Sequence, residues 1–526
     1  MSNTTKNDFY RLNALAEREK KALGMGGAAR VSRQHARGLL SARERIDRLL
    51  DNNTFNEMGL LTHSDLPAAK DRSAADGKIC GYGEIDQRTV LVTADDATIF
   101  AGAGGRVGVG KAHKLAQYAA DKGIPIVNLG DAGGARVPDI MGSAGMASMV
   151  YPVGGKPRNR RVPAIAAIMG NCYGGPTWTA QVSDVVIQVK GTIMCVGGSS
   201  ILTIATGEQT PDNELGGWEL HAYDTGLVDL FAEDEEECLW LIRKVLSYLP
   251  SSADELPPVY SCEDPADASL DAVFDVVPED PRQVYDMHDL IHLIADEDSV
   301  LELRPYYDGS LITTLTRIDG HSVGVLANNP LVRAGAMGPG ACEKAAAFIA
   351  LCDSFHIPLL FLHDTPGFLV GKEAEDGKIG LRIMTMIEAL HRSTVPRVSI
   401  VVRKSYGMAH CNMSGGKMGN DILMAWPIAD ISFMAPEVAV NVAYGRKLHA
   451  LAQEDPAQVE TMRQVYLDEL NRGSEPWDAA GHFLLDKIIR PQDTRREIIQ
   501  ALRRAQGANG EKGRSERLMA NWPTMF

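Results

Sequence analysis

Fully apolar runs alternate with amphipathic segments along most of this chain. Residues 124–134 and 357–367 each carry an apolar run that ends in Asp and Gly. Residues 162–175 and 395–409 each carry a second apolar run, which ends in a glycine turn. Continuous apolar runs are typical of strands buried on both faces, and the segment at 109–123 has the periodicity of an amphipathic helix. The pattern therefore predicts an α/β fold.

The same pattern occurs twice, at a constant offset of 233 positions. No gap is needed to align the segment from Ile85 to Gly174 with its second copy. The alternative, two generic α/β segments with coincident Gly and Pro residues, does not account for an offset that stays constant. We therefore predict two tandem α/β domains related by an internal repeat. Matched pairs are Lys111 and Lys344, Ile124 and Ile357, Asp131 and Asp364, and Tyr173 and Tyr406.

The segment between the two copies is predicted to be a linker. Residues 250–281 are rich in Pro, Ser and Asp and have no helical period. We predict a helical N-terminal extension over residues 1–30, an N-terminal domain over 31–260 and a C-terminal domain over 276–526.

Composition and charge exclude several classes of function. The 526 residues hold 53 Lys and Arg against 68 Asp and Glu, a net charge of −15, which disfavours nucleic-acid binding. Helix N-termini still allow an anionic ligand. There is no apolar run of ~18 residues for membrane insertion and no apolar signal segment at the start, so the predicted location is the cytoplasm. The cysteines form no CxxC pair and the histidines have no metal-ligand spacing, so we expect no metal site.

Two glycine turns are the best candidates for chemistry. Gly174 and Gly175 follow an apolar run, and Gly407, Met408 and Ala409 occupy the equivalent turn in the second half. Backbone N–H groups at a helix start favour negative charge, and glycine lets a ligand approach closely. Such donors stabilise an oxyanion without an ionisable side chain. Two turns predict two anion-stabilising sites for two carbonyl-bearing substrates; the alternative is two tight turns that only pack closely.

Charged residues near these turns have less specific interpretations. Arg136 either contacts an anionic cofactor or is a solvated loop cation. His410 is interpreted as a packed or hydrogen-bonded histidine rather than a catalytic base. Asp131 and Asp364, which end apolar runs, are interpreted as hydrogen-bonding to the turns that follow them. The fingerprints GxGxxG after a strand, GxxxxGK[ST], GxSxG and HExxH are missing, which disfavours several common enzyme classes.

At these motifs the sequence resembles the carboxyltransferase (β) subunits of biotin-dependent acyl-CoA carboxylases. The likeness runs from about residue 30 to about residue 505 and is carried by segments such as LSARERIDRLLD, LGDAGGARVPDIMGSAG, GNCYGGPTWTAQVSDVV, LHDTPGFLVG and AWPIADISFMAPEVAVNV. Together these segments are highly specific. The resemblance implies two crotonase-like domains, each a ββα superhelix, in a homo-oligomer that is a hexamer, a dimer of trimers.

The resemblance also implies roles for the two turns. The N-terminal domain holds the acyl-CoA, whose thioester carbonyl is polarised by the amides of Gly174 and Gly175. The C-terminal domain holds carboxybiotin, whose ureido carbonyl is polarised by the amides of Met408 and Ala409. The carboxyl group passes to the α or vinylogous carbon of the acyl group through an enolate. The implied substrate-binding residues are Gly133, Gly134, Arg136, Tyr173, Pro366, Gly367, His410 and Cys411.

The missing parts of such an enzyme imply partners. The sequence has no biotin-attachment motif of the Ala-Met-Lys-Met kind and no region for an ATP-grasp domain. We therefore expect biotin on a separate carrier subunit and its carboxylation on a partner biotin carboxylase.

Two departures from the family pattern leave the acyl group open. The usual Gly-Gly-Ala turn is Gly407-Met408-Ala409 here, and Cys411 stands where propionyl- and acetyl-CoA-type members carry Asp. Alternative functions are the carboxyltransferase subunit of a decarboxylase complex of the glutaconyl-CoA type, a single-substrate crotonase hydratase or isomerase, and a non-catalytic scaffold subunit.

Overall fold

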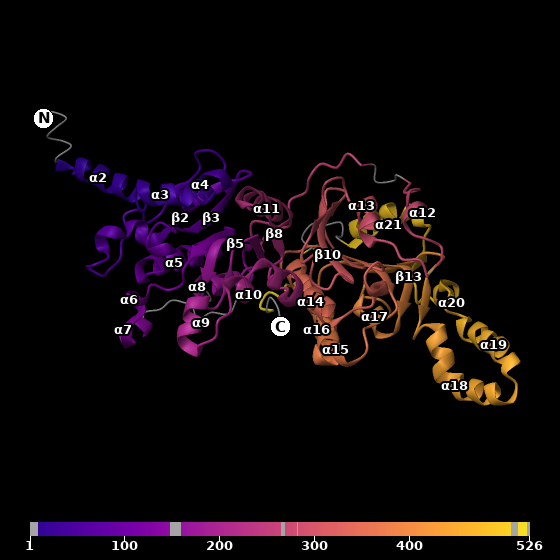
Figure 1. Cartoon of the computed structure of the whole chain (residues 1–526). Coiled ribbons are helices and arrows are strands. Elements are labelled where there is room, and N and C mark those ends of the chain that lie inside the picture. The colour runs from indigo at the N-terminus through magenta and orange to yellow at the C-terminus, as the bar shows by residue number, and fades with distance from the viewer. Residues whose placement is uncertain (1–8, 148–158, 265–268, 281, 506–513, 523–526) are drawn as a thin grey trace. The chain divides into compact units, whose positions relative to one another are not determined.

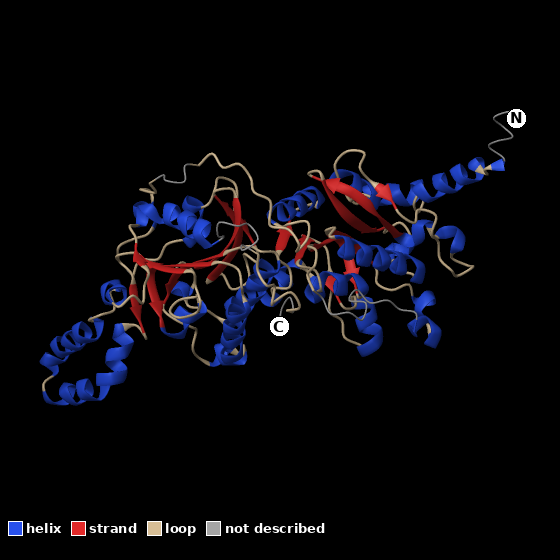
Figure 2. Ribbon diagram, turned by 180° about the vertical axis from the view of Figure 1, so that it is seen from behind, coloured by secondary structure: helices blue, strands red, loops and turns tan. Residues whose placement is uncertain are grey.

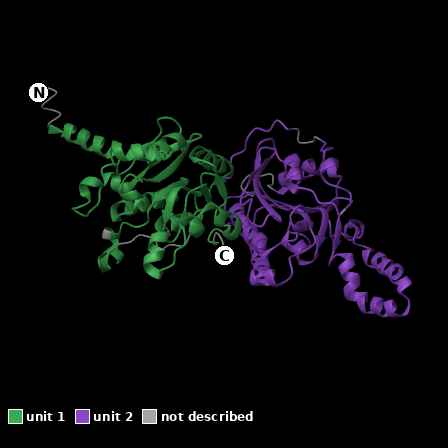
Figure 3. Ribbon diagram, viewed as in Figure 1, with its two compact units in different colours: residues 1–255, 520–524 green, residues 256–519, 525–526 purple. Residues whose placement is uncertain are grey.

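The chain forms two compact units, each built around one twisted sheet (Figures 1, 2 and 3). The computed structural model describes residues 9–147, 159–264, 269–280, 282–505 and 514–522. Unit 1 consists of Met1–Glu255 and Ala520–Thr524, and unit 2 of Leu256–Met519 and Met525–Phe526.

Unit 1 has a mixed sheet with parallel central strands. The strands are β1 (Asn56–Glu57), β2 (Lys78–Ile85), β3 (Arg88–Asp95), β4 (Ile126–Ala132), β5 (Ala164–Tyr173), β6 (Val185–Val189), β7 (Met194–Cys195) and β8 (Leu230–Ala232). Their order is β1-β2-β3-β4-β5-β6-β8, with β7 paired to the end of β5. The helices are α2 (Leu12–Leu23), α3 (Ala28–His35), α4 (Ala42–Leu49), α5 (Arg106–Lys122), α6 (Val137–Ile140), α7 (Gly142–Ala147), α8 (Gly175–Gln181), α9 (Ser199–Thr206), α10 (Asp212–Gly216) and α11 (Glu235–Tyr248).

Unit 2 repeats this arrangement. The strands are β9 (Leu301–Glu302), β10 (Leu311–Ile318), β11 (His321–Asn328), β12 (Leu359–Thr365), β13 (Arg397–Tyr406), β14 (Ile422–Ala425), β15 (Asp430–Ser432) and β16 (Lys487–Ile488), in the order β16-β14-β13-β12-β11-β10-β9 with β15 on β13. The helices are α12 (Val273–Val276), α13 (Met287–Ile294), α14 (Pro339–Ser354), α15 (Lys372–Asp376), α16 (Ile379–Arg392), α17 (Gly407–Asn412), α18 (Pro436–Glu454), α19 (Val459–Asn471), α20 (Pro476–Gly481) and α21 (Thr494–Ala505). Figure 1 shows α18 and α19 as a hairpin that extends away from the sheet of unit 2.

The offset of 233 found in the sequence holds strand by strand. β2 and β10, β3 and β11, β4 and β12, and β5 and β13 begin and end at positions that differ by 233. The register between β4 and β5 shifts between Gly130 and Ala132. The register between β12 and β13 shifts at the equivalent place, between His363 and Thr365. The predicted α/β class and the internal repeat are confirmed, and the repeat places both glycine turns at the carboxyl ends of equivalent strands.

The segments outside the repeat differ in part from expectation. In the N-terminal extension, α3 continues past residue 30 to His35. Within the predicted linker, Val273 and Val277 are buried in the core of unit 2, because α12 packs beside α13. Every helix in the described part of the chain is too short or too polar to cross a bilayer.

Candidate active site

The first glycine turn joins β5 to α8 in unit 1. Gly174 has φ of 63°, a left-handed conformation that favours glycine, and its N–H donates to the carbonyl of Cys195 at 3.1 Å. The N–H of Gly175, the first residue of α8, has no hydrogen-bond partner among the described residues. A Cβ at Gly175 meets no atom within 4 Å. The turn therefore offers one open donor, at Gly175, where the sequence predicted two.

A cavity of about 520 Å³ opens beside this donor. Residues of α5, α8, β3, β4 and β5 line it, together with Gly134, Gly174 and Gly175. Gly134 also has a left-handed φ, of 96°, and its carbonyl accepts from the N–H of Gly104 at 2.8 Å. Most of the lining is apolar, which suits a largely hydrophobic ligand with one polar group at the open N–H. Three of the predicted residues thus meet at one cavity.

The second turn joins β13 to α17 in unit 2. Gly407 has φ of 60°, and the amides of Met408 and Ala409 have no hydrogen-bond partner among the described residues. The Met408 side chain is 44% exposed, whereas Ala409 is fully buried. The turn therefore has two unpaired backbone donors, an exposed one at Met408 and a buried one at Ala409, and the Met408 side chain does not fill the interior.

Behind the second turn lies a buried chain of hydrogen bonds. The Ser405 hydroxyl lies 3.0 Å from Nδ1 of His363 and 2.8 Å from Nδ1 of His410. Burial lowers the pKa of His410 to about 4, and burial together with repulsion from His410 lowers the pKa of His363 well below its usual value. Both imidazoles are therefore neutral near pH 7. His410 is a hydrogen-bonded histidine; its contact with substrate stays a prediction.

Each turn is preceded by a tyrosine bonded to an aspartate. Tyr173 donates to Asp212 at 2.8 Å, and Tyr406 donates to Asp430 at the equivalent place in unit 2. Burial, reinforced by the neighbouring carboxylate, raises the pKa of both phenols. Tyr173 does not belong to the described lining of the cavity, so the structure gives it a supporting position beside the turn.

The other predicted residues lie near the turns in varied surroundings. The Gly133 N–H donates to Ala101 at 2.9 Å, and Gly133 does not line the cavity. Pro366 stands at its equivalent position and has no N–H to donate. The Gly367 N–H donates to the Thr365 hydroxyl at 3.1 Å. Cys411 is half-buried in α17, and burial raises the pKa of its thiol.

Arg136 is not the solvated loop cation that the sequence allowed. Its side chain is buried and pairs with Asp76 at 2.7 Å and with Asp139, and it lies over the ring of Phe100. The two carboxylates hold the Arg136 side chain, which does not belong to the described lining of the cavity. An ionic contact of Arg136 with substrate therefore stays a prediction.

The buried aspartates at the ends of β4 and β12 form ion pairs, so hydrogen bonding to the following turns is not their main role. Asp131 pairs with Arg45 at 3.0 Å and Asp364 with Arg403 at 2.8 Å. The two arginines come from different elements, α4 and β13. A buried charge is costly without a partner, so both pairs serve the fold.

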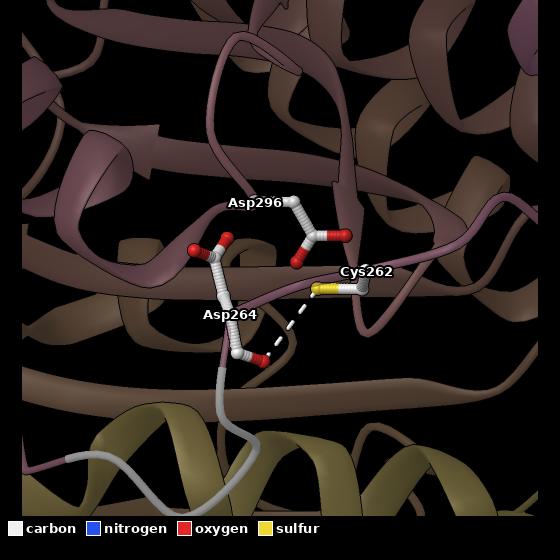
Figure 4. A group of neighbouring side chains, drawn as sticks. All are labelled: Cys262, Asp264 and Asp296. Atoms are coloured by element: carbon white, nitrogen blue, oxygen red, sulfur yellow. Dashed lines mark hydrogen bonds between the residues drawn. The ribbon is translucent and has the colours of Figure 1, made fainter.

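One cluster has donors of the kind that bind metals. Figure 4 shows Cys262, Asp264 and Asp296, whose ligand atoms lie within 4.8 Å of one another. A guanidinium nitrogen of Arg495 lies 2.7 Å from Asp296 and 3.6 Å from the Cys262 sulfur. Asp296 also accepts from the N–H groups of Asp319 and Gly320. The guanidinium of Arg495 thus already balances the charge of Asp296, and we interpret the cluster as an ion-pair network.

Some residues of the site escaped the sequence analysis. Ala112, Ala116 and Ala120 line the cavity from α5, and Ser405 links the two histidines. The alanines were visible in the sequence as small residues four positions apart, a spacing that places them on one helix face. Nothing local marked Ser405, because its partners come from a neighbouring strand and from the turn.

Similarity to known proteins extends over both units. The carboxyl transferase domain family matches residues 33–517. The carboxyltransferase subunit of propionyl-CoA carboxylase from Haloferax mediterranei is 36% identical over 501 residues, 94% of this chain and 95% of the relative. The alpha subunit of methylmalonyl-CoA decarboxylase from Propionigenium modestum is 34% identical over 500 residues, 93% of this chain and 95% of the relative. The transcarboxylase 12S hexamer, solved with methylmalonyl-CoA and methylmalonic acid bound, matches with a TM-score of 0.87 at 33% identity over 94% of this chain and 95% of that chain.

Proposed function

The chain belongs to the carboxyl transferase domain family of biotin-dependent enzymes that act on CoA thioesters, and we propose that it moves a carboxyl group from carboxybiotin to the α or vinylogous carbon of an acyl-CoA. One observation carries the proposal. The repeat sets open backbone donors at the carboxyl ends of β5 and β13, so that one chain has two places for a developing oxyanion.

Unit 1 holds the acyl-CoA in this proposal. The Gly175 N–H donates to the thioester oxygen, which becomes negative as the enolate forms. The Gly174 N–H stays on Cys195 and fixes the turn. Gly134 leaves the space beside the thioester free of side-chain atoms. A donor that is already in place costs no reorganisation when charge develops, so each contributes ~3 kcal/mol of transition-state stabilisation.

Unit 2 holds the biotin ring. Carboxybiotin supplies the CO2 and a basic nitrogen that removes the α-proton from the acyl group. The N–H groups of Met408 and Ala409 donate to the ureido oxygen. His410, neutral and bonded through Nδ1 to Ser405, supports the turn and is not the base. This chain contributes positioning and electrostatics, and no acid–base side chain is required.

The proposed partners follow from the reaction. Biotin arrives on a separate carrier, carboxylated by a biotin carboxylase, and the chain assembles with its own copies as a hexamer. The site then combines unit 1 of one copy with unit 2 of another. Light scattering that shows an active monomer would contradict this assembly.

A reconstituted assay tests the activity. Purified chain is mixed with a biotin carboxylase, a biotinylated carrier, ATP and labelled bicarbonate, and a series of acyl-CoAs is offered. The proposal predicts incorporation of label into the acyl-CoA, dependent on the carrier. Carrier-dependent decarboxylation of a malonyl-type CoA without net carboxylation favours the decarboxylase direction, in keeping with the methylmalonyl-CoA decarboxylase relative. A scaffold subunit supports neither reaction.

A further inference from the structure

Each glycine turn is bridged by a side-chain hydrogen bond between the same two positions. In unit 1 the Thr177 hydroxyl, in the first turn of α8, lies 3.2 Å from the carbonyl of Cys172 near the end of β5. In unit 2 Nδ1 of His410, in α17, lies 2.8 Å from the Ser405 hydroxyl near the end of β13. At the offset of 233, Cys172 corresponds to Ser405 and Thr177 to His410. We call each of these contacts a turn bridge, because it joins the strand before the turn to the helix after it.

The turn bridge of unit 1 also ties the turn to β7. The Thr177 side chain is buried, and its hydroxyl lies 2.8 Å from the carbonyl of Cys195 in β7. The same carbonyl accepts the N–H of Gly174 at 3.1 Å. Pro176, whose ring fixes its φ, stands between Thr177 and Gly175. The Thr177 hydroxyl therefore holds the backbone only two residues away from the unpaired N–H of Gly175.

The turn bridge of unit 2 continues to the neighbouring strand. The Ser405 hydroxyl also lies 3.0 Å from Nδ1 of His363 in β12, and both Ser405 and His363 are fully buried. His363 corresponds to Gly130, where a Cβ would lie 2.9 Å from the Cys172 sulfur. Unit 1 therefore has no room for such an imidazole, and its bridge ends on backbone carbonyls instead. A buried chain of satisfied hydrogen bonds rigidifies the backbone to which it is attached.

The two helix starts depend on these bridges. α8 has seven residues and α17 has six, and no described side chain makes a hydrogen bond at the N-cap of either helix. Such short helices are unstable by themselves in water, so contacts with the rest of the unit set the direction of their first N–H groups. The tyrosine–aspartate pairs beside the turns hold the strand ends, whereas the turn bridges hold the helices. A donor that is poorly aligned stabilises an oxyanion less, because a hydrogen bond weakens steeply as its angle falls.

We propose that Thr177 and Ser405 are positioning residues, which act through the turn bridges. Thr177 orients the amide of Gly175 in unit 1, and Ser405 orients the amides of Met408 and Ala409 in unit 2. The inference rests on the proposed function, because it takes these amides to stabilise the oxygens of two different substrates. Neither hydroxyl touches a substrate in this arrangement. Removing one therefore lowers kcat and kcat/KM by the same factor and leaves KM unchanged, since the interaction that weakens is made in the transition state.

The test of unit 1 uses the full chain with a biotinylated carrier, and rates are given per folded enzyme, with folding followed by urea unfolding. Thr177→Val keeps the shape of the side chain and removes the hydroxyl. It is expected to lower kcat for transfer to acyl-CoA about tenfold and to leave KM within about twofold. Decarboxylation of carboxybiotin on the carrier, measured without acyl-CoA, should stay unchanged, and Thr177→Ser should restore kcat. Thr192→Val is the matched control, because the Thr192 hydroxyl is equally buried and lies 2.7 and 3.3 Å from the carbonyls of Val189 and Ile168, outside the turn.

The test of unit 2 uses Ser405→Ala. This variant is expected to lower the carrier half-reaction about fivefold, because the amides that hold the ureido oxygen lose their alignment while both remain present. Ser399→Ala is the matched control: Ser399 is a fully buried serine of the same strand, and its hydroxyl donates to the carbonyl of Ser414 at 2.9 Å. The control should keep the rate of the carrier half-reaction within about twofold.

The outcomes separate the inference from the proposed function. An active wild type with Thr177→Val or Ser405→Ala at wild-type kcat, or with KM raised at unchanged kcat, overturns the positioning role and leaves the function standing. A loss no greater than that of the matched control also overturns it, since the hydroxyl then only stabilises the fold. If Thr177→Val does not fold, Thr177→Ala, which adds no methyl group beside the carbonyls, is judged by the same criteria. A wild type that catalyses neither half-reaction overturns the proposed function and, with it, the inference.

Discussion

Gly175→Val tests the open donor of unit 1 with little expected damage to the fold. A Cβ at Gly175 meets no atom within 4 Å, and the residue has no left-handed φ, so a branched side chain fits the protein itself. Gly and Val differ by a few tenths of a kcal/mol in helix propensity, so the free energy of unfolding should change by less than ~0.5 kcal/mol. The new methyl groups instead occupy the space where the thioester approaches the N–H. Losing one preorganised donor costs ~3 kcal/mol, or about 10²–10³ in rate.

The assay compares kcat/KM for acyl-CoA carboxylation with the midpoint of urea unfolding. Gly380→Val is a matched control, because Gly380 also lies in the first turn of a helix and its Cβ also meets nothing within 4 Å. The control is expected to keep its rate within about twofold, as surface substitutions usually do. A Gly175→Val enzyme that is folded and retains more than about a tenth of its rate would refute the role of this donor.

Three further predictions concern unit 2. Cys411→Asp should change the ranking of acyl-CoA substrates more than it changes the use of biotin; a uniform loss across substrates argues against an acyl contact. His410→Ala should lower the rate less than about tenfold, whereas loss of a general base lowers it by ~10²–10⁴. A loss of ~10³ in a folded variant would argue that His410 is a side-chain base. The hydrogen bond that the His288 imidazole donates to Glu302 raises the pKa of His288 to about 9. The stabilisation that protonated His288 gives the fold is therefore complete below pH ~6.5 and is lost as the pH rises toward 9. Between pH ~6.5 and ~9.5 the free energy of unfolding of His288→Gln should therefore fall less than that of the wild type.

The repeat made most of the fold predictable. A constant offset in the sequence located equivalent strands and both turns, because buried strands and glycine turns leave local signals. The family resemblance predicted two crotonase-like domains, and the similarity to the transcarboxylase 12S structure confirms this prediction. Unpaired backbone donors at Gly175, Met408 and Ala409 lie where the glycine turns predicted them.

The remaining features depend on contacts distant in sequence. The Gly174 amide is occupied because β7 returns beside β5, which brings Cys195 within 3.1 Å. Arg136 is buried because Asp76, sixty positions earlier, reaches it. Nothing in the local pattern marks such partners, since any of the chain's acidic residues is an equal candidate. The cavity escaped notice for a similar reason: its lining comes from α5, α8 and three strands that are distant from one another in the sequence.

The central claim is that the two turns serve two different carbonyl groups. Its most direct test separates the half-reactions in Gly175→Val and in Met408→Pro, which removes one unit 2 N–H at a first-turn position where Pro is tolerated. Decarboxylation of carboxybiotin on its carrier is measured without acyl-CoA, and transfer is measured with it. The account predicts that Gly175→Val loses transfer but keeps the carrier half-reaction, whereas Met408→Pro loses both by about 10² or more. Equal loss of both half-reactions in Gly175→Val, or a normal carrier half-reaction in Met408→Pro, would contradict it.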